Sequence, residues 1–233
     1  MKPVSRPRII ANLAMTADGK IDSARREGPK FSSRIDRDRM DALRAEADVL
    51  IVGAATIRAE DPPLRVKDPS RRAARLAAGR HEELIVVVLS HEGRIPAAAR
   101  FLREPAASRW LVVPGDLPEA ALTALTEALD AGTLTLFRAG SGAVDLAALV
   151  AHLSGLGART LLVEGGGETV ARFLADGLLD ELNLTICPTI LGGRGAPTPV
   201  EGPGFSMVER RMLTLAAIDR VGDELFLKYI VAH

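Results

Sequence analysis

Short apolar runs recur along the chain and alternate with segments whose apolar residues are spaced as on one face of a helix. The runs have the length and the β-branched content of buried strands. They predict strands near Arg8–Met15, Asp48–Gly53, Leu84–Ser90, Trp110–Val113, Thr133–Phe137, Thr160–Glu164, Glu181–Cys187, Met207–Ile218 and Glu224–Val231. Because strands and helical patterns alternate as far as Ala175, the pattern indicates an α/β fold with a mainly parallel sheet.

Three predicted helices are marked by residues at their starts. Asp145 would act as the N-cap of a helix with apolar residues at i, i+3, i+4 and i+7, namely Leu146, Leu149, Val150 and Leu153. An alanine-rich helix over Glu119–Leu129 is entered through Pro118. Ser33 and Asp36 three residues later resemble a capping box, which predicts that a helix begins there.

The pattern changes toward the C-terminus, where a strand, a glycine-rich loop, a second strand, a turn at Gly222 and a third strand follow one another. That order is typical of antiparallel pairing, so the predicted sheet is mixed. No repeat or long linker divides the chain, which predicts one domain over residues 1–233. Within it, the polar segment Asp61–Arg80 predicts a surface loop with a short helix, and long loops are often functional or mobile.

Composition and charge place the chain among ordinary globular proteins. Of its 233 residues 47% are hydrophobic and 26% charged, and 30 basic residues balance 30 acidic ones. The balance gives no sign of a nucleic-acid partner, and apolar runs such as Leu84–Leu89 are too short to cross a membrane. The N-terminal residues lack a secretory signal and the single cysteine, Cys187, excludes an intramolecular disulfide, so we expect a cytoplasmic location.

The segment LLVEGGGETVARFL (Leu161–Leu174) is the first candidate for chemistry. A strand that ends in a polar residue and continues through glycines into a helix has the geometry that receives phosphate, because backbone amides and the positive helix end favour an anion. The glycines are contiguous and do not form the dinucleotide fingerprint. A tight strand-to-helix turn explains them equally well.

A second strand end has the same character. The strand Asp48–Val52 runs into Gly53, and the small residues Ala54, Ala55 and Thr56 open a predicted helix. Open α/β sheets bind ligands at the carboxyl ends of their strands, and two such ends fit a dinucleotide better than one phosphate. The alternative to ligand binding is that these small residues only allow a helix to pack closely against the sheet. On residue type alone, Arg44 and Lys67 are solvated surface residues.

Several kinds of site are missing from the sequence. His81 and Glu83 form a His-x-Glu pair, but no Pro-Cys-x-x-Cys follows, which excludes the zinc deaminase site. The four histidines and Cys187 show no metal-ligand spacing, so we expect no metal. Neither a nucleophile elbow nor a P-loop is present.

The motifs TADGKID, LRAEADVLIVGAATIRAEDPPLRV and LLVEGGGETVARFLADGLLDELNLTICPTILGGRGAP follow one another in this order. Together they resemble the pyrimidine reductases of riboflavin biosynthesis, which occur alone or as the C-terminal half of a bifunctional deaminase–reductase. The resemblance covers nearly the whole chain and is weakest over Asp68–Thr135. It implies a dihydrofolate-reductase-like fold, a mixed sheet flanked by helices, and a homodimer. It also implies NADPH-dependent reduction of a ribosylaminopyrimidine 5′-phosphate to its ribitylamino form.

The resemblance also assigns residues. For the cofactor the matching positions are Ala14, Phe31, Gly53, Thr56, Glu60, Ser90, Gly166, Gly167, Glu168 and Thr169. For the substrate they are Arg44, Leu64, Lys67 and Glu164, with Arg44 and Lys67 at the positions that meet the sugar phosphate. Glu164 is also the candidate acid of the reaction, with substrate orientation as its alternative role. The family usually has Asp at position 60 and Arg at position 67, so Lys67 gives up bidentate phosphate geometry.

Two other functions stay open at this point. One is a reductase of another pterin- or folate-like heterocycle, and the other is a nucleotide-binding module without catalysis. The sequence also leaves open whether the pyrimidine is deaminated before reduction, and whether the cofactor is NADPH or NADH.

Overall fold

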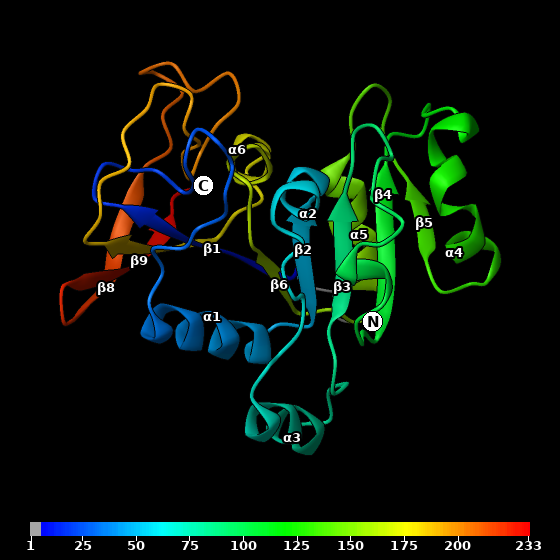
Figure 1. Ribbon diagram of the computed structural model, residues 1–233, viewed down its shortest axis with the longest axis horizontal. Coiled ribbons are helices and arrows are strands. Elements are labelled where there is room, and N and C mark those ends of the chain that lie inside the picture. Colours follow the sequence, from blue (N-terminus) through cyan, green and yellow to red (C-terminus); the bar gives the residue numbers. More distant parts are fainter. Residues whose placement is uncertain (1–5) are drawn as a thin grey trace. The chain divides into compact units, whose positions relative to one another are not determined.

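The computed structural model describes residues 6–233, and the described chain forms two compact units (Figure 1). One comprises Asp41–Leu162 together with Arg6 and Pro7, and the other comprises Arg8–Met40 and Val163–His233. No described helix is long and apolar enough to span a bilayer.

Parallel strands form the centre of the first unit. Strands β2 (Val49–Gly53), β3 (Ile85–Leu89), β4 (Ser108–Val113) and β5 (Thr135–Arg138) pair in that order, and β6 (Thr160–Val163) lies on the other side of β2. The middle strands are buried along nearly their whole length. This accords with the continuous apolar runs in the sequence, which a parallel sheet covered on both faces requires.

The structure confirms one of the two helices predicted in this unit and divides the other into two parts. Helix α5 (Leu146–Gly155) is as predicted, since its apolar face is buried and the Asp145 carboxylate accepts a hydrogen bond from Ala148 N at 2.9 Å. The helix predicted over Glu119–Leu129 is confirmed only in part. That stretch forms a 3₁₀ helix, η2 (Glu119–Leu125), followed by α4 (Thr126–Asp130). The buried Leu122 and Leu125 are three residues apart, a spacing that a 3₁₀ helix stacks on one side.

The polar segment contains the predicted loop and helix. After α2 (Ala54–Glu60) the chain runs through residues 61–68 into α3 (Pro69–Ala77). The Asp68 carboxylate caps α3 by accepting hydrogen bonds from Ser70 N at 2.7 Å and Arg71 N at 3.3 Å. A short 3₁₀ helix, η1 (Arg100–Leu102), follows β3.

The second unit carries the antiparallel strands that the C-terminal pattern predicted. Strand β1 (Arg8–Thr16) pairs in parallel with β7 (Glu181–Cys187), whereas β9 (Glu224–Val231) is antiparallel to β7 and to β8 (Leu213–Val221). The turn between β8 and β9 contains Gly222, with φ +62°.

Strand β8 begins later than the predicted Met207. The reason lies in Arg211, whose Nε donates to Leu174 O at 3.1 Å and whose Nη2 donates to Ala175 O at 2.8 Å. These carbonyls belong to the last turn of α6 (Gly167–Ala175). Arg211 is thereby bonded to the helix end, although the Met212 carbonyl still accepts a hydrogen bond from Ala232 N at 3.0 Å.

Helix α1 (Arg34–Glu46) starts where the sequence predicted, with one difference in the cap. The Ser33 hydroxyl accepts hydrogen bonds from Ile35 N at 3.0 Å and Asp36 N at 3.1 Å. The Asp36 carboxylate accepts a hydrogen bond from the Ser32 hydroxyl at 2.6 Å, a side-chain contact in place of the bond to the N-cap amide that completes a capping box.

Candidate active site

Three glycines connect β6 to α6, and each has its own structural role. Gly165 has φ +83°, a left-handed conformation that residues with a side chain rarely adopt. Gly166 is the N-cap of α6 and Gly167 is its first residue. A Cβ atom on Gly167 would lie 2.2 Å from Thr198 O and 2.7 Å from Glu201 Cγ. The third glycine is therefore needed for close packing of the chain's own segment 198–201.

The N-terminus of α6 presents backbone amides in addition to this packing. Thr169 N donates to Gly166 O at 2.9 Å, and the amides of Gly167 and Glu168 precede the first intrahelical bond. Such amides, together with the helix dipole, favour an anion. The turn and the anion site that the sequence left as alternatives are thus compatible at this position.

Other residues assigned by the resemblance lie in the same unit. Ala14 lies on β1 opposite Thr185 of β7 and is half-buried. Glu164 follows β6 directly and is also half-buried, as is Phe31 in the segment ahead of α1. Glu164 therefore lies between the end of β6 and the glycines, as predicted.

The Asp18–Gly19 turn, which the sequence predicted, also makes hydrogen bonds to a loop that is distant in the sequence. Gly19 N donates to Thr16 O at 2.9 Å, which closes the predicted turn. The Asp18 carboxylate also accepts hydrogen bonds from Leu191 N at 3.1 Å and Gly192 N at 2.7 Å. The hydrogen bond from the Thr16 hydroxyl, supported by the bonds from these two amides, lowers the pKa of Asp18 to about 2. The charged carboxylate thereby joins the end of β1 to the glycine-rich loop that follows β7.

In the first unit, two strand ends meet at one edge of the sheet. Gly53 is the last residue of β2 and pairs with Leu89, and Ser90 follows directly. The Ser90 side chain is 2% exposed, and its hydroxyl has no hydrogen-bond partner among residues 6–233. Thr56 and Glu60 lie on α2, half-buried and exposed respectively. A buried, unsatisfied hydroxyl at the carboxyl edge of parallel strands fits a ligand-binding edge.

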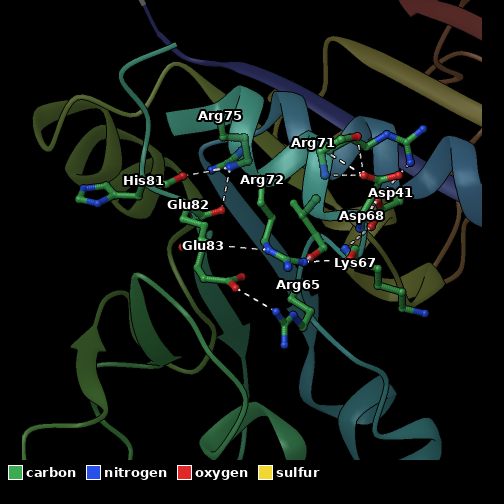
Figure 2. A network of polar contacts seen from close by, with 12 residues as sticks. Asp41, Arg65, Lys67, Asp68, Arg71, Arg72, Arg75, His81, Glu82 and Glu83 are labelled. Atoms are coloured by element: carbon green, nitrogen blue, oxygen red, sulfur yellow. Dashed lines mark hydrogen bonds and ion pairs between the residues drawn. The ribbon is translucent and has the colours of Figure 1, made fainter. Parts of the chain in front are cut away.

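Three of the residues assigned to the substrate, Arg44, Leu64 and Lys67, belong to the segment 61–68 or bond it, and Lys67 is labelled in Figure 2. Arg44 is 2% exposed, and its Nη1 donates to Pro63 O at 2.9 Å and Arg65 O at 3.0 Å. Leu64 between them is buried, whereas Lys67 is exposed. Arg44 is therefore no solvated surface residue: it bonds the main chain of the segment that carries the other two.

Residues that the sequence did not single out complete this arrangement. The Asp41 carboxylate accepts hydrogen bonds from Lys67 N at 2.6 Å and Asp68 N at 3.2 Å, and it pairs with Arg71 Nη1 at 3.1 Å. The i, i+3 spacing of Asp41 and Arg44 could have indicated that both lie on one face of a helix. It does not indicate which segment they contact.

Two further kinds of chemistry find no support in the structure. Burial, and then the negative charge of Glu224, raise the pKa of the Cys187 thiol to about 12, so the thiolate needed for nucleophilic attack is not formed near neutral pH. Within residues 6–233, no cluster of three or more His, Cys, Asp or Glu side chains is placed to hold a metal ion.

A family model described as the RibD C-terminal domain matches residues 7–227. The chain belongs to this family. A 2,5-diamino-6-ribosylamino-4(3H)-pyrimidinone 5′-phosphate reductase from Archaeoglobus fulgidus is 32% identical over 219 residues, covering 94% of this chain and 95% of the relative. A reductase of the same name from Methanothermobacter thermautotrophicus is 34% identical over 229 residues, covering 97% and 99%. The resemblance predicted from the sequence is confirmed.

Solved structures confirm the fold class of this RibD C-terminal domain. A pyrimidine reductase-like protein from Corynebacterium diphtheriae aligns with a TM-score of 0.85 at 22% identity, covering 97% of this chain and 92% of that one. A dihydrofolate reductase from Enterococcus faecalis aligns with a TM-score of 0.50 at 9% identity, covering 98% of both. At these identities the similarity concerns the fold alone. The fold is dihydrofolate-reductase-like, with a mainly parallel sheet and antiparallel C-terminal strands.

Gly167→Ala tests the packing role of the third glycine. We expect the added methyl group to lower the free energy of unfolding by about 1–3 kcal/mol, because it collides with Thr198 O. Gly155→Ala is the matched control, since a Cβ atom at this last residue of α5 meets nothing within 4 Å and a gain of about 0.4–1 kcal/mol is expected. Urea unfolding measures both, and equal effects would refute the packing role.

Proposed function

We propose that this RibD C-terminal domain reduces 2,5-diamino-6-ribosylamino-4(3H)-pyrimidinone 5′-phosphate in riboflavin biosynthesis. The observation that carries the proposal is the similarity to two reductases of that name over nearly the whole length of all three chains. Of the two ring forms that the sequence left open, the name of these relatives favours the diamino form, which is reduced before deamination. One functional domain over residues 1–233 and a cytoplasmic location stay predictions.

The cofactor we propose is NADPH, which belongs to the nicotinamide class that reductases of this family use. When bound, it would supply the hydride that reduces C1′ of the opened ribose. The amides at the start of α6, with Gly166, Gly167, Glu168 and Thr169, would bind its pyrophosphate. The buried hydroxyl of Ser90 supports a cofactor contact at the edge formed by β2 and β3, beside Gly53 and α2 with Thr56 and Glu60. Ala14 and Phe31 would contact the nicotinamide.

For the substrate, we propose that Lys67 binds the 5′-phosphate and that Arg44 and Leu64 shape the segment around it. The exposure of Lys67 and the burial of the other two support this division of tasks. Glu164 would donate the proton that accompanies hydride transfer, because it is the carboxyl group at the strand end next to the glycines.

The function is tested by steady-state oxidation of the cofactor, followed by its near-ultraviolet absorbance. We expect turnover with the diamino substrate, weaker turnover with the deaminated ring, and none with dihydrofolate. We also expect NADPH to be used in preference to NADH. Turnover of dihydrofolate alone would favour a folate-type reductase, and cofactor binding without turnover of any substrate would favour a non-catalytic module.

Glu164→Gln separates proton donation from orientation. Glutamine keeps the shape and hydrogen-bonding capacity of the side chain but has no transferable proton at neutral pH, so kcat should fall by about 10²-fold or more while KM stays nearly constant. A rise in KM with an unchanged kcat would mean that Glu164 only orients the substrate.

We further propose that the protein is a homodimer that uses strand β8. This strand pairs with β9 on one side, ends the strand order, and is exposed at all nine positions. Its apolar side chains Leu213, Leu215, Ile218 and Val221 are 37–56% exposed. Contiguous exposed apolar side chains on an edge strand are typical of an interface, and a second copy would cover them.

Light scattering tests the homodimer. We expect twice the mass of the 24.7 kDa chain, and a monomer for Leu215→Glu, because a charge would have to be buried in the interface. Leu76→Glu on α3 is the control, since Leu76 is similarly exposed in the other unit. A monomeric parent protein, or dissociation by both substitutions, would contradict the use of β8.

A further inference from the structure

Helix α1 holds the segment 61–68 by two buried side chains on one of its faces. Asp41 is 5% exposed and Arg44 is 2% exposed, and the two are three residues apart. Arg44 donates to the carbonyls of Pro63 and Arg65, whereas Asp41 accepts from the amides of Lys67 and Asp68. In all four contacts, the bonded group of the segment is a main-chain amide or carbonyl. The contacts therefore fix the path of the segment independently of its side chains.

The far end of the segment is fixed as well. Arg75 on α3 donates through Nη1 to Arg44 O at 3.2 Å and Ala45 O at 2.8 Å. Its Nε donates to His81 O at 3.0 Å (Figure 2). Arg71 pairs with Asp41 at 3.1 Å. Helix α3 is therefore bound to the C-terminal half of α1, and the segment has little freedom at either end.

Lys67 is held on both of its peptide groups. Its amide donates to Asp41 Oδ1 at 2.6 Å, and its carbonyl accepts from Arg72 Nη1 at 2.8 Å. The side chain itself is exposed and points away from the network in Figure 2. A lysine with an immobilised backbone and an exposed ammonium group binds an anion with less loss of conformational freedom than one on a mobile loop.

We propose that Asp41 is a positioning residue for the substrate phosphate, acting through the amide of Lys67. The proposal rests on the function proposed above, which supplies a phosphorylated substrate and assigns its phosphate to Lys67. Asp41 touches neither substrate nor cofactor. Its carboxylate fixes the backbone from which the ammonium group of Lys67 reaches the phosphate.

Asp41→Asn in the full chain tests this role. Asparagine keeps the size of the side chain but loses the charge that pairs with Arg71 and one of the two acceptor oxygens. We expect KM for the phosphorylated substrate to rise about tenfold, with kcat and cofactor affinity nearly unchanged. KM for the same compound without its phosphate should stay constant. An unchanged ratio of the two KM values would overturn the proposal.

Asp48→Asn is the matched control. The Asp48 carboxylate likewise accepts two backbone amides, from Arg159 at 2.8 Å and Thr160 at 3.0 Å, and lies 3.6 Å from Arg80 Nη1. Its replacement should reduce stability but leave the KM ratio constant. Lys67→Met should change the ratio as Asp41→Asn does, and the double variant should add nothing to Lys67→Met. Additive effects would show that Asp41 acts independently of Lys67, against the proposal.

Binding of ribose 5-phosphate, measured by calorimetry, separates this proposal from the proposed function. If the parent protein turns over no pyrimidine, the function fails, while about tenfold weaker binding to Asp41→Asn and to Lys67→Met still supports the positioning role. Equal binding to all three proteins overturns that role. Should Asp41→Asn fail to fold, Arg72→Met removes the bond to the Lys67 carbonyl instead and is expected to weaken binding in the same direction.

Discussion

The last carbonyl groups of helix α1 lie beyond the regular intrahelical bonds, apart from that of Arg44, which accepts from Ala47 N at 3.2 Å, and they need other donors. Arginine side chains supply them. Arg75 donates to the carbonyls of Arg44, Ala45 and Ala47, and Arg80 donates to that of Glu46. Positive charge at this end also suits the helix dipole. Because Arg75 belongs to α3, satisfying these carbonyls decides where α3 lies.

The other contacts of this region follow from that placement. With α3 bound to the end of α1, the segment 61–68 passes the face of α1 that carries Asp41 and Arg44, and both bond its main chain. Burial, with the nearby charge of Arg80, lowers the pKa of Arg75, yet a guanidinium keeps its proton and offers five donors in a fixed plane. A lysine could not serve the same set of carbonyls.

The three glycines after β6 combine a packing role with backbone amides that are placed to bind an anion. Gly165 takes a left-handed conformation, and Gly167 admits the carbonyl of Thr198. Both are structural needs, and neither removes the amides at the start of α6 from anion binding. The tight turn and the ligand site were therefore never exclusive alternatives.

Local patterns in the sequence predicted most of the fold. The apolar runs and the change of order before Gly222 predicted the parallel and antiparallel strands correctly, and Asp145 predicted the start of α5. Each of these signals lies within a few neighbouring residues. The errors at Glu119–Leu129 and Met207 lie where a distant contact or a buried spacing prevailed, as with Arg211 and the end of α6.

For the candidate site, the sequence by itself determined which residue types are present and, by resemblance, which positions we assign to cofactor and substrate. Only the tertiary structure decided what they do locally. On residue type alone Arg44 is a solvated residue, but folding buries it against carbonyls 19 and 21 residues away. The partner of a buried charge is set by chain topology, and side-chain type and spacing do not encode it.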